Sequence, residues 1–222
     1  MKEMSVKELY SLEHTRAKKL LESVEYPWQA LAKIRDTIIE IGKTLPADRY
    51  DQVEEDVWIA KSAQVAPTAY IHGPAIIGEE TEVRHCAFIR GSALVGDHCV
   101  VGNSTELKNV ILFDNVQVPH YNYVGDSVLG YRSHMGAGSI TSNVKSDKKL
   151  VVVKAGTERI ETGLKKFGAM LGDNVEVGCG TVLNPGSVVG RDCIIYPLSM
   201  VRGFVRPGSI YKNQNEIVAR VD

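Results

Sequence analysis

The sequence predicts a mainly β fold, a single-stranded parallel β-helix of six-residue repeats, preceded by an α-helical hairpin. The first observation is an aliphatic residue at every sixth position from Ile59 to Leu107, in a register that returns from Leu171 to Val201. An α-helix repeats its faces every 3.6 residues and a strand every two, so neither element explains a period of six. A triangular coil with three sides of six residues explains it, because each side turns one aliphatic residue inward.

A second observation supports the coil: a small or compact side chain follows most of these aliphatic positions by four residues. Ala63, Ala75, Cys99 and Cys193 are examples. A compact residue there lets the next corner close, and successive coils then stack at about the 4.8 Å strand spacing. The four cysteines show no C-x-x-C spacing, so we expect free thiols and a cytoplasmic protein.

The change of period predicts two domains. Residues 1–50 have apolar residues at helical spacing, with Pro27 opening a second helix, and are expected to form the helical hairpin. This hairpin could cover the open N-terminal end of the coil or recruit a partner. Residues 51–222 are expected to form the β-helix. The repeat stops over about residues 141–169, which predicts an extended, lysine-rich loop.

Composition narrows the classes of partner. The formal charge of −1 gives no basic excess for a nucleic acid. No stretch approaches the ~20 apolar residues of a membrane span, and no signal-peptide core is present. His72, His85 and His98 lie thirteen residues apart, whereas one full coil takes eighteen, so they should not stack into one cluster. We therefore expect no metal site, no membrane partner and no nucleic acid.

The stretch from Lys108 to Asn143 interrupts the strict repeat and gathers residues that carry chemistry. The runs ELKN, PHYNYVGDS and MGAGSITSN, followed by a lysine-bearing loop and GAMLGDNVEVG, resemble one family. It is the acetyltransferase domain of bifunctional sugar-1-phosphate nucleotidylyltransferase/glucosamine-1-phosphate N-acetyltransferases. The resemblance covers about residues 57–206. It implies a left-handed coil, a homotrimer, acetyl-CoA as co-substrate and a place in UDP-N-acetylglucosamine biosynthesis.

The same resemblance implies roles for individual residues. His120 matches the general base, which suits the chemistry because the sugar amine must be neutral to attack a thioester and an imidazole titrates near neutral pH. The substrate-binding positions match Arg90, Lys108, Tyr123, His134 and Lys149. The positions that hold acetyl-CoA match Ala137, Asn143 and Cys179.

Two of these positions depart from the family pattern. His134 stands where most bacterial two-domain members have an asparagine that contacts the sugar, and Cys179 stands where they have a serine beside the thioester. The amino sugar and the acyl group therefore stay open. No glycine-rich nucleotide-binding loop precedes the coil, so nucleotidyltransferase activity is not expected, and a separate nucleotidyltransferase is a candidate partner.

The sequence thus predicts an acyl-CoA-dependent N-acetyltransferase that moves acetyl from acetyl-CoA to the amine of a phosphorylated amino sugar, such as glucosamine 1-phosphate. Two alternatives stay open. One is a non-catalytic, regulatory β-helix that binds a sugar phosphate or a nucleotide sugar. The other is an acyltransferase for another amino sugar. A regulatory module has no need of a base such as His120 beside a phosphate site.

Overall fold

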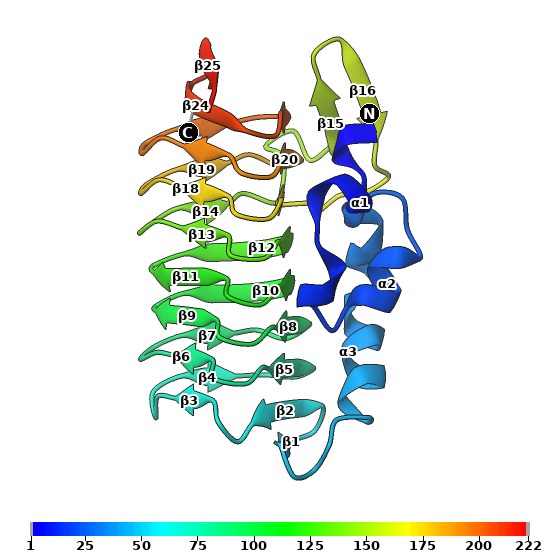
Figure 1. The fold of residues 1–222 in the computed structure, drawn as a ribbon, viewed down its shortest axis with the longest axis vertical. Coiled ribbons are helices and arrows are strands. Elements are labelled where there is room, and N and C mark those ends of the chain that lie inside the picture. Colours follow the sequence, from blue (N-terminus) through cyan, green and yellow to red (C-terminus); the bar gives the residue numbers. More distant parts are fainter. Residues whose placement is uncertain (1, 221–222) are drawn as a thin grey trace.

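The computed structural model describes residues 2–220, and it confirms the predicted parallel β-helix of hexapeptide repeats (Figure 1). The strands that form the coil pair in parallel with their equivalents one coil further on. In regular coils that equivalent is eighteen residues away, as in the pairing of Ala75 with Ala93 and of Glu176 with Ile194. The aliphatic residues of the six-residue repeat fill the interior of the coil, where Ile89, Leu107 and Leu183 are fully buried.

The coil has three faces, which we name for reference. The first face contains β4 (Tyr70–Ile71), β7 (Phe88–Ile89), β14 (Ile140–Thr141), β19 (Val182–Leu183) and β22 (Met200–Val201). The helix-covered face contains β2 (Val57–Ala60), β5 (Ala75–Ile77), β8 (Ala93–Val95), β17 (Ala169–Leu171), β20 (Ser187–Val189) and β23 (Phe204–Val205). The third face contains β3 (Gln64–Val65), β6 (Glu82–Val83), β9 (Val100–Asn103), β11 (Gln117–His120), β13 (His134–Met135), β18 (Glu176–Val177), β21 (Ile194–Ile195) and β24 (Ser209–Asn213).

Two strands run through the corner between the first and the helix-covered face: β10 (Glu106–Leu112) and β12 (Tyr123–Leu129). Their residues pair at a spacing of seventeen instead of eighteen, as in Val110 with Ser127. The missing residue falls at Asn109 and Asp126, which turn the corner with positive φ values of 55° and 49°. The sequence indicated an interruption of the repeat between Lys108 and Asn143, and the structure places the two shortened turns at Asn109 and Asp126.

The insertion also leaves the coil at this corner. It departs after Asn143 and returns at Phe167, whose N–H donates to the Asn143 carbonyl over 3.0 Å. Between them, β15 (Val152–Ala155) and β16 (Glu158–Glu161) form an antiparallel hairpin. In Figure 1 this hairpin projects beside the last coils. The coil therefore departs from its regular course three times at one corner, in two shortened turns and one insertion.

The N-terminal segment is a string of short helices instead of two long ones. It comprises η1 (Lys2–Met4), α1 (Val6–Leu9), η2 (Leu12–His14), α2 (Lys18–Glu22), η3 (Pro27–Lys33) and α3 (Ile34–Gly42). Main-chain bonds to the coil explain the breaks: the carbonyls of Leu9 and His14 accept the N–H groups of Asp173 and Asp114 over 3.1 and 3.0 Å. A carbonyl that accepts an N–H group of the coil is not used for an α-helical hydrogen bond, so the helix ends there.

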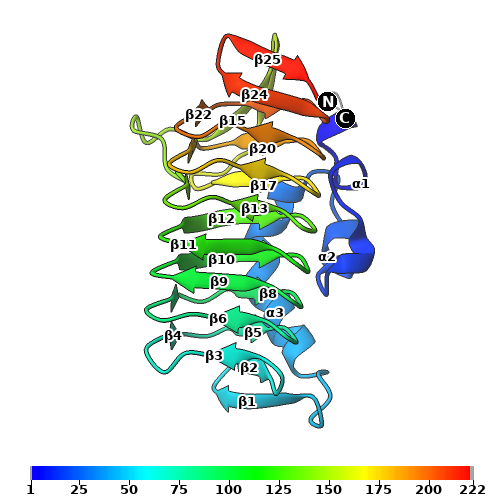
Figure 2. The same ribbon diagram turned by 60° about the vertical axis from the view of Figure 1, so that its left-hand side comes forward.

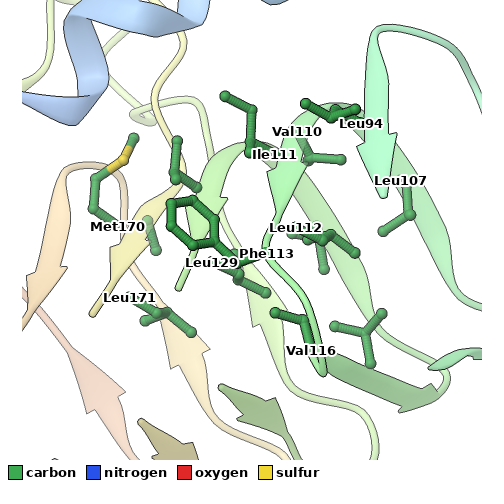
Figure 3. Packing of buried hydrophobic residues seen from close by; sticks show 14 of the residues in the cluster. Leu94, Leu107, Val110, Ile111, Leu112, Phe113, Val116, Leu129, Met170 and Leu171 are labelled. Carbon is green, nitrogen blue, oxygen red and sulfur yellow. The ribbon is translucent and has the colours of Figure 1, made fainter. Parts of the chain in front are cut away.

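The segment lies along the side of the coil and runs from its last turns back to its first (Figures 1 and 2). It covers outward-facing apolar residues of the helix-covered face, among them Leu94, Ile111 and Met170, each at most 2% exposed. Figure 3 shows this packing beside the interior residues Leu107 and Leu112. These helices and the coil share one hydrophobic core.

Antiparallel strands cover both ends of the coil. At the first turn β1 (Tyr50–Glu54) pairs with β2, and at the last turn β25 (Glu216–Ala219) pairs with β24. The helices therefore lie along the side of the coil. The N-terminal end of the coil, which the helical hairpin was one candidate to cover, is covered by β1 instead. Within residues 2–220 no helix has the length and apolar character needed to cross a membrane.

Candidate functional site

Three of the predicted site residues lie one above another at the corner between the third and the first face. The N–H of Gly138 donates to the carbonyl of His120 over 3.0 Å, and the N–H of Gly180 donates to the carbonyl of Ala137 over 2.9 Å. Cys179 therefore follows Ala137, which follows His120, on successive coils. All three are exposed. We call this the His120 corner.

A repeated backbone conformation forms this corner. Tyr121, Gly138 and Gly180 each have positive φ, at 53°, 69° and 66°, which is uncommon for a bulky residue such as tyrosine. The buried Asn122 fixes the turn: its side-chain oxygen accepts the N–H of His120 over 3.1 Å, and its amide donates to the carbonyl of Gly136 over 2.9 Å. Asn122 thus holds the main chain of His120 to the next coil, a role that the sequence analysis missed.

The imidazole of His120 has no hydrogen-bond partner within residues 2–220. Among residues 2–220, the one side-chain-mediated hydrogen bond at this residue uses its main-chain N–H. The imidazole is exposed and available to a ligand. The backbone N–H groups of Ala137 and Cys179 likewise donate to no acceptor in this part of the chain. A proton acceptor and two unused donors therefore share the corner.

A hydrogen-bonded cluster occupies the next corner, at the far edge of the first face. The carboxylate of Asp126 accepts from Lys108 Nζ and Asn109 Nδ2 through Oδ1, both over 2.9 Å, and from Asn143 Nδ2 through Oδ2 over 2.6 Å. The same Asn143 amide donates to the hydroxyl of Tyr123 over 3.1 Å. We call this the Asp126 corner. It brings together three predicted residues, Lys108, Tyr123 and Asn143.

Burial raises the pKa of the Tyr123 phenol above its usual range, and the negative charge of Asp126 raises it further, while the hydrogen bond from Asn143 acts in the opposite direction. The phenol therefore stays neutral and keeps its proton. Because its oxygen already accepts from Asn143, the O–H is left to donate to a ligand.

Arg90 lies one coil below Lys108 on the same outward column, since its N–H donates to the carbonyl of Leu107 over 2.8 Å. Its guanidinium pairs with Glu106 over 2.6 Å. Each cation predicted to bind phosphate on this face thus has an acidic partner, Glu106 for Arg90 and Asp126 for Lys108. The sequence analysis assigned no role to either acid, although Asp126 stands within the VGDS run.

The structure does not bring His134 and Lys149 to this cluster within one chain. His134 lies on the third face, where its Nδ1 is 2.9 Å from Glu176 Oε2. Lys149 lies exposed on the insertion, and its main-chain N–H donates to Asp147 Oδ1 over 3.0 Å. In the described residues its side chain makes no hydrogen bond or ion pair to Asp126, Tyr123 or Lys108.

The insertion adds a second basic region. Lys145, Lys154 and Arg202 line a pocket of about 370 Å³ between the insertion and the last coils of the first face. Lys145 pairs with Asp147 over 3.2 Å. The insertion packs closely against the coil here, because a Cβ placed on Gly203 of the coil would lie 2.5 Å from the carbonyl oxygen of Lys154 in the insertion. The predicted lysine-rich loop is therefore partly packed against the coil.

Comparison with known proteins identifies relatives of the β-helix. The family model described as the GMPPB C-terminal domain matches residues 71–191, a range that contains every predicted site residue. The bifunctional protein GlmU of Methanococcus aeolicus is 34% identical over 120 residues, which are 54% of this chain and 29% of that protein. The bifunctional sugar-1-phosphate nucleotidylyltransferase/acetyltransferase of Sulfurisphaera tokodaii is 35% identical over 112 residues, 50% of this chain and 28% of that protein.

The chain thus spans less than a third of the length of these two relatives. Among solved structures, a putative acetyltransferase of Bacillus cereus matches with a TM-score of 0.41 and 18% identity, over 74% of this chain and 77% of that chain.

Proposed function

This chain belongs to the family of the GMPPB C-terminal domain, and on that premise we propose that it transfers acetyl from acetyl-CoA to the amine of a phosphorylated amino sugar. Glucosamine 1-phosphate is the first acceptor to test. The names of the relatives support an acetyltransferase, since one is a bifunctional sugar-1-phosphate nucleotidylyltransferase/acetyltransferase. The observation that carries the proposal is the column of His120, Ala137 and Cys179 at one corner.

In the proposed reaction the amine attacks the thioester carbonyl directly. The imidazole of His120, which has no partner within residues 2–220, accepts the amine proton as the C–N bond forms. It then passes this proton to the thiolate of CoA, which leaves as the C–S bond breaks. The N–H groups of Ala137 and Cys179, which have no acceptor within residues 2–220, are placed to donate to the oxyanion of the tetrahedral intermediate. The proposal assigns Asn143 to the Asp126 corner and not to the oxyanion, because its amide donates to Asp126 and Tyr123.

The first face would bind the acceptor phosphate. Lys108 has donors left after its bond to Asp126, and the Tyr123 O–H is free to donate. The guanidinium of Arg90 can exchange Glu106 for phosphate, because an exposed ion pair contributes little stability, about 0–1 kcal/mol. Lys149, on the insertion, is the fourth residue of this proposed set.

A complete site needs a second copy of the chain. His134 faces away from the Asp126 corner in its own subunit, on another face of the coil. In the homotrimer that the family resemblance implies, the third face of one subunit would lie against the first face of its neighbour. Multi-angle light scattering should then report three times the 24.4 kDa chain mass. A monomer at assay concentration would contradict this arrangement of His134.

The experiment that tests the function is a thiol-release assay with acetyl-CoA against a panel of amino sugars and their 1-phosphates. We expect release with at least one 1-phosphate, and the free sugar to be the poorer acceptor because Lys108 and Tyr123 lose their ligand. Retained binding of a sugar phosphate without thiol release from any of them would instead identify a non-catalytic binding module. Thiol release with a different amine only would mean that the acceptor is another amino sugar.

A further inference from the structure

The carboxylate of Asp126 is the most connected polar group at the candidate site. The residue is 3% exposed, and its two side-chain oxygens accept from Lys108, Asn109 and Asn143. Its main-chain carbonyl accepts the N–H of Gly168, over 2.8 Å, where the insertion returns to the coil. A buried carboxylate that loses its hydrogen bonds costs much free energy. The carboxylate of Asp126 therefore holds its three donor side chains in place.

We propose that Asp126 is a positioning residue of the acceptor site, which holds Lys108 and Tyr123 as hydrogen-bond donors for the acceptor phosphate. This inference rests on the proposed function. A carboxylate only accepts, so the Asn143 amide must turn its NH₂ toward Asp126. The same NH₂ then donates to the Tyr123 oxygen. The phenol therefore presents its O–H outward, where a phosphate oxygen can accept it.

Lys108 is oriented by the same carboxylate. One N–H of its ammonium donates to Asp126 Oδ1, and two donors remain. The pair is neutral overall, so the site recognises a phosphate through directed donors more than through net charge.

The N-terminal segment supports this arrangement from behind. The Asn109 amide that donates to Asp126 also donates to the main-chain carbonyl of Leu31 in η3, over 3.2 Å. The ring of Trp28, in the same helix, stacks on Phe167 at the end of the insertion, with centroids 5.7 Å apart. One role of the N-terminal helices is thus to hold the Asp126 corner and the base of the insertion together.

The test begins with Asp126→Asn, which keeps the shape but has one acceptor atom instead of two. In either orientation of the new amide an N–H faces one of the donors, Lys108 with Asn109 or Asn143. We expect the acceptor KM, and the Kd of glucosamine 1-phosphate by calorimetry, to rise about tenfold or more. The KM for acetyl-CoA should stay within about twofold, because Ala137 and Cys179 lie at the other corner.

Two further variants separate positioning from stability. Asp173→Asn is the matched control: Asp173 is 2% exposed and accepts the N–H groups of Ser11 and Tyr131, so its loss should lower Tm without changing the acceptor KM. The exchange Asp126→Asn with Asn143→Asp restores the bond between these two side chains. It turns the Tyr123 O–H inward, toward the new carboxylate, so Tm should recover while the acceptor KM stays raised.

The outcomes distinguish this inference from the proposed function. An acceptor KM and Kd within twofold of wild type in Asp126→Asn, or full recovery of both in the exchanged pair, would overturn the positioning role while leaving the acetyltransferase intact. A wild-type protein that releases no thiol with any acceptor would end the proposed function. The Kd of glucosamine 1-phosphate would still decide the role of Asp126, and no measurable binding by wild type would overturn it.

Discussion

The two corners that border the first face are built in opposite ways. At the His120 corner successive coils repeat the same main-chain turn, and Tyr121, Gly138 and Gly180 share one backbone conformation. At the Asp126 corner two turns are a residue short and a third opens into the insertion. Within the part of the chain that the structure describes, the regular corner offers an imidazole without a partner and unused N–H groups. The irregular corner instead offers side chains that are already bonded to one another.

The difference teaches how one coil can carry two kinds of site. A repeated turn presents backbone N–H groups at the coil spacing of about 4.8 Å, which suits an extended ligand that lies along the coil axis, such as the arm of a CoA thioester. A shortened turn brings Asp126 into contact with Lys108, Asn109 and Asn143 of adjacent coils. It can therefore hold a compact group such as a phosphate.

The largest effect is expected from removing the imidazole of His120 at the regular corner. His120→Ala should lower kcat at least about 10²-fold, because the base that accepts the amine proton is lost. Binding of acetyl-CoA should change little, since Ala137 and Cys179 are untouched. Thiol release and calorimetry measure the two quantities on the same preparation.

The matched control is His85→Ala. His85 occupies the same column two coils earlier, where its carbonyl accepts from Asn103 Nδ2 over 2.9 Å, and its ring bonds Thr68. This variant removes the same side chain from the same turn and should keep wild-type turnover. Equal losses of turnover in both variants, or aggregation of His120→Ala alone, would mean that histidine at this corner serves the fold.

The sequence was informative where the chain repeats and less so where side chains meet. The six-residue period predicted the coil, because stacking repeats the same burial at every turn, as at Ile89 and Leu107. It also predicted the N-terminal helices but not their path, since the coil N–H groups that bond their carbonyls, those of Asp114 and Asp173, are far away in sequence. Of the site, the family motifs supplied Lys108, Tyr123 and Asn143. Asp126, which accepts from Lys108 and Asn143, was assigned no role although it stands within the VGDS run.

A smaller effect is expected from disturbing the irregular corner without removing any of its polar groups. A Cβ placed on Gly125 would lie 2.5 Å from the Tyr123 hydroxyl oxygen and 3.0 Å from Asn143 Nδ2. In Gly125→Ala the phenol, a terminal group, should move aside, so that the acceptor KM rises about fivefold to tenfold, as for one lost hydrogen bond. The Tm should fall only slightly, because the interior of the coil is unchanged.

The Tyr123→Phe variant sharpens that measurement, since it removes the oxygen that the new methyl group would displace. If the displaced hydroxyl is the cause, the acceptor KM of the double variant should equal that of Tyr123→Phe alone, and the two changes should not add. Additive increases would instead mean that the methyl group blocks the face to the sugar itself. The comparison thus separates a hydrogen bond that the Asp126 corner supplies from the open space that Gly125 provides beside it.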